Sequence, residues 1–282
     1  MSETIGVLHP GEMGAAMGAA ARTGGARVLW ASAGRGAETR RRAAAAGLAD
    51  AGSVQALARA SGTIVSVCPP HAAVDVAREV AAAGFAGVYV DANAVSPGTV
   101  EEIGRVVTKA GATFVDGSII GRPPRKPGES RLYLSGAGAA EVARWFAGGV
   151  FDAVVLPGGP GAASALKMAY AAWTKGTSAL IMTIRALAQA HGVDEALIRE
   201  WERSQPELPA RSERAVRDTA RKAWRFVGEM EEIAASLAGA GLPDGFYRAA
   251  AEVYQRLADY KDVAEPPAVG EALGRITSER RR

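Results

Sequence analysis

The chain has 282 residues, of which 48% are hydrophobic and 22% are charged, a composition that is ordinary for a globular protein and excludes a disordered chain. No apolar run reaches the roughly 18 residues of a membrane-spanning helix, and the N-terminus lacks the basic and apolar regions of a signal peptide. The single cysteine, Cys68, excludes an internal disulfide, and the three histidines have no metal-ligand spacing. We therefore expect a cytoplasmic protein with no membrane association and no bound metal.

The formal net charge of +3 is a small excess. Part of it lies in Arg280–Arg282, which we expect to be a solvated tail. No basic stripe is interleaved with aromatic residues, as it is in proteins that bind single-stranded nucleic acids. We expect no nucleic-acid partner.

In the first half of the chain, short β-branched runs alternate with alanine-rich helical stretches. The expected strands are Thr4–His9, Arg27–Ala31, Thr63–Cys68, Gly87–Asp91, Thr113–Asp116, Ser130–Ser135 and Ala153–Leu156. The expected helices are Glu12–Thr23, Ala37–Ala46, Val54–Ala60, Ala72–Ala82, Gly98–Ala110 and Ala139–Phe146. Apolar strands that alternate with helices form βαβ units, so the pattern predicts an α/β Rossmann-type domain with a parallel sheet.

The second half changes character after the turn Pro157–Gly161, because no strand pattern remains. Ala162–His191 predicts one unusually long helix. Further helices are expected at Asp194–Glu202, Pro209–Val227, Met230–Ala240 and Gly245–Tyr260. We therefore expect a dinucleotide-binding domain at residues 1–158 and an all-helical substrate and dimerisation domain at 159–282. One small domain cannot cover so long a helix, which favours a homodimer through the helical domain.

Residues 5–14, IGVLHPGEMG, follow the first strand and open the first helix. The Rossmann turn G-x-G-x-x-G falls here on His9, Gly11 and Gly14, so its first glycine is missing. The helix N-terminus offers backbone N–H groups to a phosphate. The predicted cofactor-binding residues of this turn are His9, Pro10, Gly11, Glu12 and Met13, with His9 as a wall residue. An ordinary strand–helix loop is the alternative.

The end of the second strand indicates which dinucleotide binds. Enzymes that use NAD place a carboxylate there, whereas this chain has none before Glu38. Ser32, Arg35 and Arg40 suit the 2′-phosphate of NADP instead. We therefore favour NADP(H) over NAD(H); a solvated, arginine-rich start of a helix is the alternative.

Five segments extend this interpretation: IGVLHPGEMG, VSVCPP, VDANAVSP, VDGSIIG and GAASALKMAYAAW. In order and spacing they resemble the β-hydroxyacid dehydrogenase superfamily, which includes 6-phosphogluconate and 3-hydroxyisobutyrate dehydrogenases and the imine reductases. The closest resemblance is to a phosphogluconate-dehydrogenase-like branch with its own type of C-terminal domain. The resemblance covers nearly the whole chain and implies an NAD(P)-dependent oxidoreductase.

The resemblance implies roles for two loops. Val67, Cys68 and Pro69 would lie beside the nicotinamide ribose, with Cys68 as a packing residue because nothing near it in sequence lowers its pKa. Asn93 would lie near the nicotinamide and Ser96 on the substrate side. For Asn93 and Ser96, the alternative is that their side chains cap the next helix.

Lys167 matches, in shifted form, the lysine of the family's G-x-x-x-K motif. The resemblance implies a general acid/base in the cleft between the domains, a role that suits lysine if burial lowers its pKa from about 10.4 toward neutrality. A surface lysine is the alternative. The expected reaction is hydride transfer between NADP(H) and a small carbonyl or hydroxy compound. An imine reductase and a non-catalytic NADP-binding sensor are the alternatives.

Two departures from the family concern the substrate. Ile120 stands where the family has a substrate-gripping serine, and Tyr170 and Ala171 stand where it has an asparagine after the lysine. Both changes favour a bulkier or less acidic substrate. The expected substrate residues are Ser96, Ile119, Ile120, Gly121, Tyr170 and Trp173. Simple core aromatics are the alternative for Tyr170 and Trp173.

Gly228 interrupts a helical pattern between dense charges. It could kink the helix and carry Glu229 or Glu232 toward the site. A solvated acidic face is the alternative that we favour.

Overall fold

The computed structural model describes residues 3–278. The chain divides into two compact units, unit 1 at Met1–Met168 and unit 2 at Ala169–Arg282. The division falls within helix α7 (Ala162–Ala171), whereas the sequence places it at the preceding turn, Pro157–Gly161. The expected tail Arg280–Arg282 lies outside the described residues.

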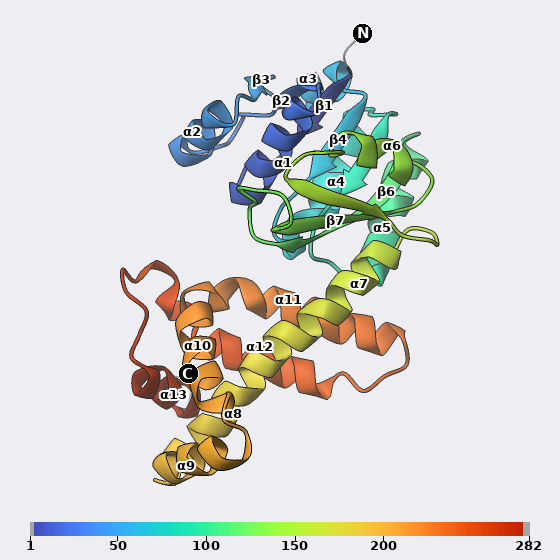
Figure 1. Cartoon of the computed structure of the whole chain (residues 1–282). Helices are drawn as coiled ribbons and strands as arrows, with labels where there is room; N and C mark the ends of the chain where they lie inside the picture. Colours follow the sequence, from blue (N-terminus) through green and yellow to red (C-terminus); the bar gives the residue numbers. More distant parts are fainter. Residues whose placement is uncertain (1–2, 279–282) are drawn as a thin grey trace. The chain divides into compact units, whose positions relative to one another are not determined.

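Unit 1 contains one eight-stranded sheet with the order β3-β2-β1-β4-β5-β6-β7-β8 (Figure 1). The strands are β1 (Thr4–Val7), β2 (Arg27–Trp30), β3 (Ala49–Asp50), β4 (Thr63–Ser66), β5 (Val88–Asp91), β6 (Thr113–Gly121), β7 (Ser130–Ser135) and β8 (Phe151–Val155). The expected Rossmann-type fold is confirmed. The prediction of a wholly parallel sheet is wrong for one pair of strands, because β6 and β7 are antiparallel. The loop 122–129 between them is too short for a parallel crossover, which needs a dozen or more residues.

Helices cover both faces of this sheet. They are α1 (Glu12–Thr23), α2 (Ala37–Ala45), α3 (Val54–Ala60), α4 (Ala73–Ala82), α5 (Pro97–Lys109) and α6 (Ala139–Arg144), with a short 3-10 turn η1 (Pro70–Ala72) before α4. Helices α1 and α6 bury Met17 and Val142 against one face. Helices α3, α4 and α5 bury Leu57, Val80 and Ile103 against the other. Because helices bury both faces of the sheet, the strands have apolar side chains on both faces.

The strand order reverses between β1 and β4. The chain runs outward from β1 to β2 and β3, then returns to place β4 on the opposite side of β1. In open α/β sheets, ligands bind outside the carboxyl ends of the strands at such a reversal. The topology therefore directs attention to the loops that follow β1 and β4.

Unit 2 is helical in every regular element between residues 169 and 278, which confirms the expected all-helical half. The expected single helix Ala162–His191 is wrong in one respect. A π-helical turn, η2 (Ala172–Gly176), separates α7 from α8 (Thr177–Ala190). The remaining elements are α9 (Asp194–Ser204), α10 (Leu208–Thr219), η3 (Ala220–Lys222), α11 (Ala223–Gly239), α12 (Gly245–Arg256), η4 (Ala258–Asp262) and α13 (Val269–Thr277).

Two helix boundaries in unit 2 differ from the prediction. The expected helix Pro209–Val227 ends at Thr219, and α11 runs through Gly228 without the expected break. Met230 and Ile233 of α11 are buried. Their burial outweighs the cost of one interior glycine, about 1 kcal/mol relative to alanine.

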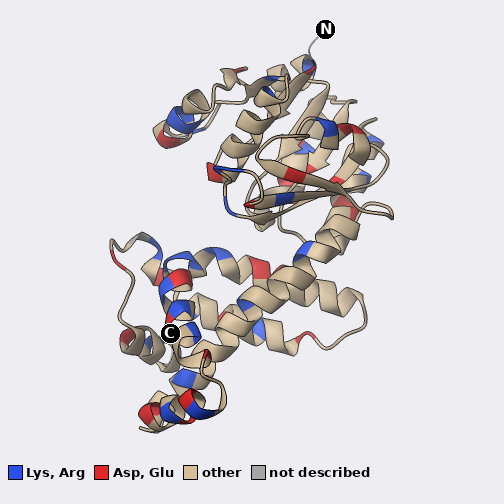
Figure 2. Cartoon of the chain, in the orientation of Figure 1, with Lys and Arg blue, Asp and Glu red and all other residues tan. Residues whose placement is uncertain are grey.

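Two elements of the structure were not predicted, and one strand is longer than predicted. Strand β3 and helix α13 have no counterpart among the expected elements, and β6 continues to Gly121, past its expected end at Asp116. The other expected elements are present, with ends shifted by a few residues. Among residues 3–278, none of the helices has the length and apolar character that crossing a bilayer requires. Basic and acidic segments alternate along the helices of unit 2 (Figure 2).

Candidate functional site

The carboxyl edge of the sheet brings together most of the predicted site residues of unit 1. His9–Met13 follow β1, Val67–Pro69 follow β4, and Asn93 follows β5. Ile119–Gly121 form the last part of β6. Parallel strands end at one edge, so segments far apart in the sequence meet there.

The turn after β1 has the geometry that a phosphate needs. A Cβ atom on Gly14 would lie 2.3 Å from the carbonyl oxygen of His9, so only glycine fits there. A Cβ on Gly11 would meet nothing within 4 Å, which leaves space in front of α1. Gly11 is the N-cap of α1 and supplies no side-chain hydrogen bond to its first N–H groups. A phosphate group fits such a helix start.

His9 and Arg35 each carry a buried nitrogen at this edge. Within the described part of the chain, His9 Nδ1 and Arg35 Nε have no hydrogen-bond partner. Burial, with the nearby Arg35 charge, lowers the pKa of His9 from 6.5 to about 4. Buried polar atoms without a hydrogen-bond partner are rare, and a bound ligand such as a dinucleotide phosphate would supply one.

The three residues predicted to bind the 2′-phosphate lie together after β2. Arg40 Nη2 donates to the carbonyl oxygen of Ser32 at 3.0 Å, and Arg40 Nε donates to that of Arg35 at 3.3 Å. Sequence reasoning missed Asp50, at the end of β3. A hydrogen bond from the Ser32 side chain and one from Gly52 N lower the pKa of the Asp50 carboxyl. A strand of two residues leaves no pattern by which Asp50 could have been found.

Asn93 connects the loops that follow β4 and β5. Its Oδ1 accepts a hydrogen bond from Cys68 N at 2.5 Å, and its Nδ2 donates to Asp91 Oδ2 at 2.6 Å and Ser66 Oγ at 3.3 Å. The helix-capping alternative is therefore wrong for Asn93. Burial, with the Asp91 charge, raises the pKa of the Cys68 thiol to about 12, so that Cys68 stays protonated at neutral pH and packs, as predicted.

Ser96 caps helix α5. Its Oγ accepts a hydrogen bond from Thr99 N at 3.3 Å, at the N-cap position. The capping alternative is confirmed for Ser96, and its predicted contact with substrate stays a prediction.

Lys167 lies against the part of β6 that extends beyond β5. The pairing of β5 with β6 ends at Asp91 and Asp116, whereas β6 continues to Gly121. On this extension the carbonyl oxygen of Ile119 accepts a hydrogen bond from Lys167 Nζ at 2.5 Å. Lys167 is half-buried and bonded to the backbone at the edge where the strand-end loops converge.

The chain is similar in sequence to one family model and one relative. Residues 188–257 match a family model described as "Domain of unknown function (DUF1932)". A protein from Methanothermus fervidus, described as an uncharacterized 28.5 kDa protein in the 7S RNA 5′ region, is 32% identical over 142 residues. That match spans 50% of this chain and 54% of the relative, about half the length of each.

Two solved structures match nearly the whole chain. The conserved protein MTH1747, described as structurally similar to 3-hydroxyacid dehydrogenases, is 27% identical with a TM-score of 0.68, covering 92% of this chain and 98% of that one. A 3-hydroxyisobutyrate dehydrogenase from Salmonella typhimurium has the same TM-score of 0.68 at 16% identity, covering 96% and 99%. The match to MTH1747 supports the predicted β-hydroxyacid dehydrogenase superfamily, and the match to the 3-hydroxyisobutyrate dehydrogenase shows that the fold is shared.

The superfamily resemblance predicted from the five segments is thus confirmed. The departure from the family that the sequence predicts falls on the last residues of β6. The side chain of Ile119 is buried in the core cluster, and its carbonyl oxygen accepts the hydrogen bond from Lys167 Nζ. Ile120 is buried as well. Gly121 has φ +135°, and a Cβ there would lie 2.2 Å from Ser130 Oγ, so the base of the hairpin requires glycine.

Two aromatic residues, Tyr170 and Trp173, follow Lys167 along the chain and lie in unit 2. Tyr170 is 47% exposed and Trp173 is 65% exposed. The alternative that they are core aromatics is therefore wrong. The Arg211 guanidinium lies over the Trp173 ring, 5.7 Å from its centroid. Their predicted contact with substrate stays a prediction.

Glu229 corrects another expectation. It is 8% exposed and forms an ion pair with Lys175 of the π-turn, so the solvated acidic face is wrong at this position. Glu231, two residues on, is exposed as expected, and Glu232 is half-buried.

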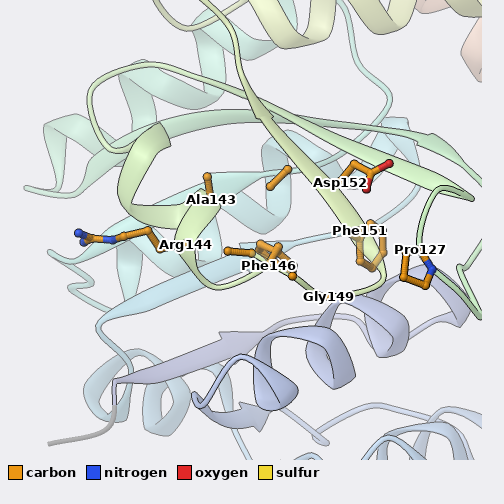
Figure 3. Close-up of a pocket in the computed structure, with 10 residues that line it drawn as sticks. Pro127, Ala143, Arg144, Phe146, Gly149, Phe151 and Asp152 are labelled. Atoms are coloured by element: carbon orange, nitrogen blue, oxygen red, sulfur yellow. The ribbon is translucent and has the colours of Figure 1, made fainter.

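A cavity of about 560 Å³ lies between α6, β8 and the β6–β7 loop (Figure 3). Its walls include Phe146, Phe151 and Pro127, and none of the predicted site residues lines it. Among residues 3–278, no group of histidine, cysteine and acidic side chains is arranged to hold a metal ion.

Proposed function

We propose that this protein is an NADP(H)-dependent oxidoreductase that transfers hydride to or from a carbon of a small carbonyl or hydroxy compound, with Lys167 as general acid/base. The observation that carries the proposal is the hydrogen bond from Lys167 Nζ to Ile119 O, beside the loops that converge at the carboxyl edge. An acid/base group at the carboxyl edge of the sheet suits hydride transfer with a dinucleotide, because ligands of such sheets bind at that edge.

The cofactor part of the proposal rests on this chain's own residues. The open space at Gly11, the uncapped start of α1 and the partnerless nitrogen of His9 fit a pyrophosphate. Ser32, Arg35 and Arg40 fit a 2′-phosphate, which favours NADP(H) over NAD(H).

In the reductive direction, NADPH bound at these residues would supply the hydride for the carbonyl carbon. Lys167 donates a proton to the carbonyl oxygen as its C=O double bond becomes a single bond, so the product is an alcohol and the lysine is left neutral. In the oxidative direction the neutral lysine removes the hydroxyl proton. An ammonium has three N–H donors, and the bond to Ile119 uses one of them.

Replacement of the lysine tests the proposal. NADPH absorbance is followed with small ketones, aldehydes, hydroxyacids and cyclic imines, for the wild-type protein, Lys167→Ala and the control Lys109→Ala. Lys109 lies in the last turn of α5 and is exposed. We expect Lys167→Ala to lower kcat by about 100-fold or more, with its NADPH Kd kept within about threefold, and Lys109→Ala to behave as wild type.

The same measurements separate the alternatives. A protein that reduces cyclic imines but no carbonyl compound is an imine reductase, and the carbonyl proposal fails. A protein that binds NADPH tightly but turns over none of these compounds is a sensor. No binding of either NADPH or NADH in calorimetry contradicts the dinucleotide prediction itself, and a preference for NADH contradicts the role of Ser32 and Arg35.

We also infer that the protein acts as a homodimer through its helical unit and works in the cytoplasm. On α8, Leu180, Ile184 and Leu187 are 42%, 37% and 61% exposed, at spacings that put them on one face. An apolar face of this kind favours burial against a partner.

A further inference from the structure

Asp116 is a fully buried carboxylate on β6 that the proposed chemistry does not use directly. Its Oδ2 accepts hydrogen bonds from Gly161 N at 2.9 Å, Ser164 N at 3.1 Å and Ser135 Oγ at 3.1 Å. Its Oδ1 accepts one from Ser164 Oγ at 2.6 Å. The side chain therefore satisfies backbone and hydroxyl donors at the start of α7.

This arrangement differs from ordinary helix capping. An ordinary N-cap comes from the residue that precedes the helix and stabilises the helix wherever it lies. Here the acceptor comes from a strand 45 residues earlier than Gly161. The negative charge also faces the positive end of the α7 dipole. The cap thus fixes the position of the helix on the sheet as well as its start.

The same strand and the same helix meet again three residues further along each. Asp116 holds Ser164, and Ile119 O accepts from Lys167 Nζ. Two contacts at matched spacing fix both the rotation of α7 about its axis and its distance along β6. Ser135 of β7 adds a third point, because its Oγ also accepts from Ala163 N at 3.2 Å.

We propose that Asp116 is a positioning residue, which acts through Ser164 to hold Lys167 in the place where it exchanges a proton. The proposal rests on the proposed function for its catalytic consequence, and on the contacts above for its structural part. A displacement of about 1 Å in a catalytic group can lower a rate by about 100-fold, so a cap that sets a helix position controls turnover more than binding.

Three variants test this role: Ser164→Ala removes the hydroxyl bond to Asp116, Asp116→Asn removes the charge, and Ser53→Ala is the matched control. Ser53 caps α3 through a bond from Ala56 N at 3.1 Å and has no link to Lys167. Two readouts are combined. The rate at which acetic anhydride acetylates Lys167 is followed by mass spectrometry. This rate reports the accessibility of the amine and does not depend on turnover of a substrate. Steady-state kinetics with NADPH titration separates kcat from cofactor binding.

We expect Ser164→Ala to raise the acetylation rate of Lys167 at least about fivefold and to lower kcat about tenfold, with the NADPH Kd unchanged. Ser53→Ala should lose thermal stability and change neither readout. An acetylation rate in Ser164→Ala within twofold of wild type overturns the proposal, even where Asp116→Asn fails to fold. If the wild-type protein turns over no compound, the oxidoreductase function fails, while acetylation still decides the positioning role.

Discussion

At the scale of single residues, His9 combines burial with a cationic neighbour. Both lower the pKa of its imidazole, from 6.5 to about 4. The ring is therefore neutral in the folded protein between these two values, while the ring in the unfolded chain takes up a proton. Unfolding binds a proton across this window, so the stability contributed by neutral His9 is complete above pH 6.5 and is lost as the pH falls toward 4.

The variant His9→Gln cannot take up this proton, and its stability should fall less between pH 7 and pH 4. We expect the difference to reach about 2 to 3 kcal/mol at pH 4, from about 1.4 kcal/mol for each pKa unit. Urea unfolding at several pH values measures it. His71→Gln is the control, since His71 is exposed. Parallel pH profiles for wild type and His9→Gln would contradict the assignment.

Asp50 is the acidic neighbour of the predicted 2′-phosphate site. It accepts a hydrogen bond from Ser32, so its negative charge opposes a phosphate at Ser32 and Arg40. We expect Asp50→Asn to bind NADPH about fivefold to tenfold more tightly, with NADH binding changed less, because only NADPH carries the extra charge. Calorimetry with both cofactors checks this, and Asp75→Asn is the control, because the Asp75 side chain of α4 is exposed. Equal gains for both cofactors would contradict it.

The sequence was sufficient to predict which loops follow the parallel strands, and the physical reason is simple. A turn such as His9–Met13 and a loop such as Val67–Pro69 are local features, and the topology alone brings their ends to one edge. Asp116 and Asp50 lay beyond this reasoning. Each forms a hydrogen bond with a residue of another segment, Ser164 for Asp116 and Ser32 for Asp50, and sequence spacing does not specify these partners.

At the scale of elements, the π-turn η2 separates α7 from α8. Its sequence, Ala172–Gly176, holds no proline and ends in one glycine, so the sequence predicted an unbroken helix. The turn is held by contacts from other helices. Tyr254 of α12 donates a hydrogen bond to Lys175 O at 2.7 Å, and a Cβ on Gly176 would lie 2.8 Å from the Tyr247 ring. Tertiary packing, which local propensity cannot show, produces the π-turn.

The ion pair of Lys175 and Glu229 fixes this turn to α11. The side chains are 19% and 11% exposed, and the ammonium also lies 4.8 Å from the centroid of the Phe226 ring. Removal of one partner leaves a charge with little access to water. We expect Glu229→Gln to lower the free energy of unfolding by about 2 to 3 kcal/mol, somewhat below the cost of breaking a fully buried pair.

Urea unfolding monitored on unit 2 tests this expectation against a surface pair. Glu213 and Arg217 of α10 form an exposed ion pair, and Glu213→Gln should cost less than about 0.5 kcal/mol. The double variant Lys175→Met, Glu229→Leu should recover part of the loss, because no charge then lacks a partner. Equal effects of Glu229→Gln and Glu213→Gln would show that the pair does not stabilise the turn.

At the scale of the whole molecule, the division into units follows from the composition of the two halves. The first half has the short apolar strands of a sheet, and the second has only helical periodicity, so the fold class was predictable from the sequence. The antiparallel pair β6–β7 was not, since a strand pattern carries no direction. Loop length gave no signal either, because the strand expected to end at Asp116 leaves residues 117–129 for a crossover, whereas the observed loop 122–129 permits only a hairpin.

The outer face of α8 leads to a prediction about assembly. Its inner face buries Ile181 and Met182 within unit 2, whereas Leu180, Ile184 and Leu187 remain exposed. We expect the wild-type protein to sediment as a dimer at micromolar concentration, and the double variant Ile184→Glu, Leu187→Glu to sediment as a monomer, because two carboxylates would be buried without partners in the interface. The control is Leu242→Glu, an equally apolar residue that is 53% exposed and lies after α11, which should stay dimeric. Analytical ultracentrifugation distinguishes the two states. A monomeric wild type, or a double variant that remains a dimer, would assign this face of α8 another role.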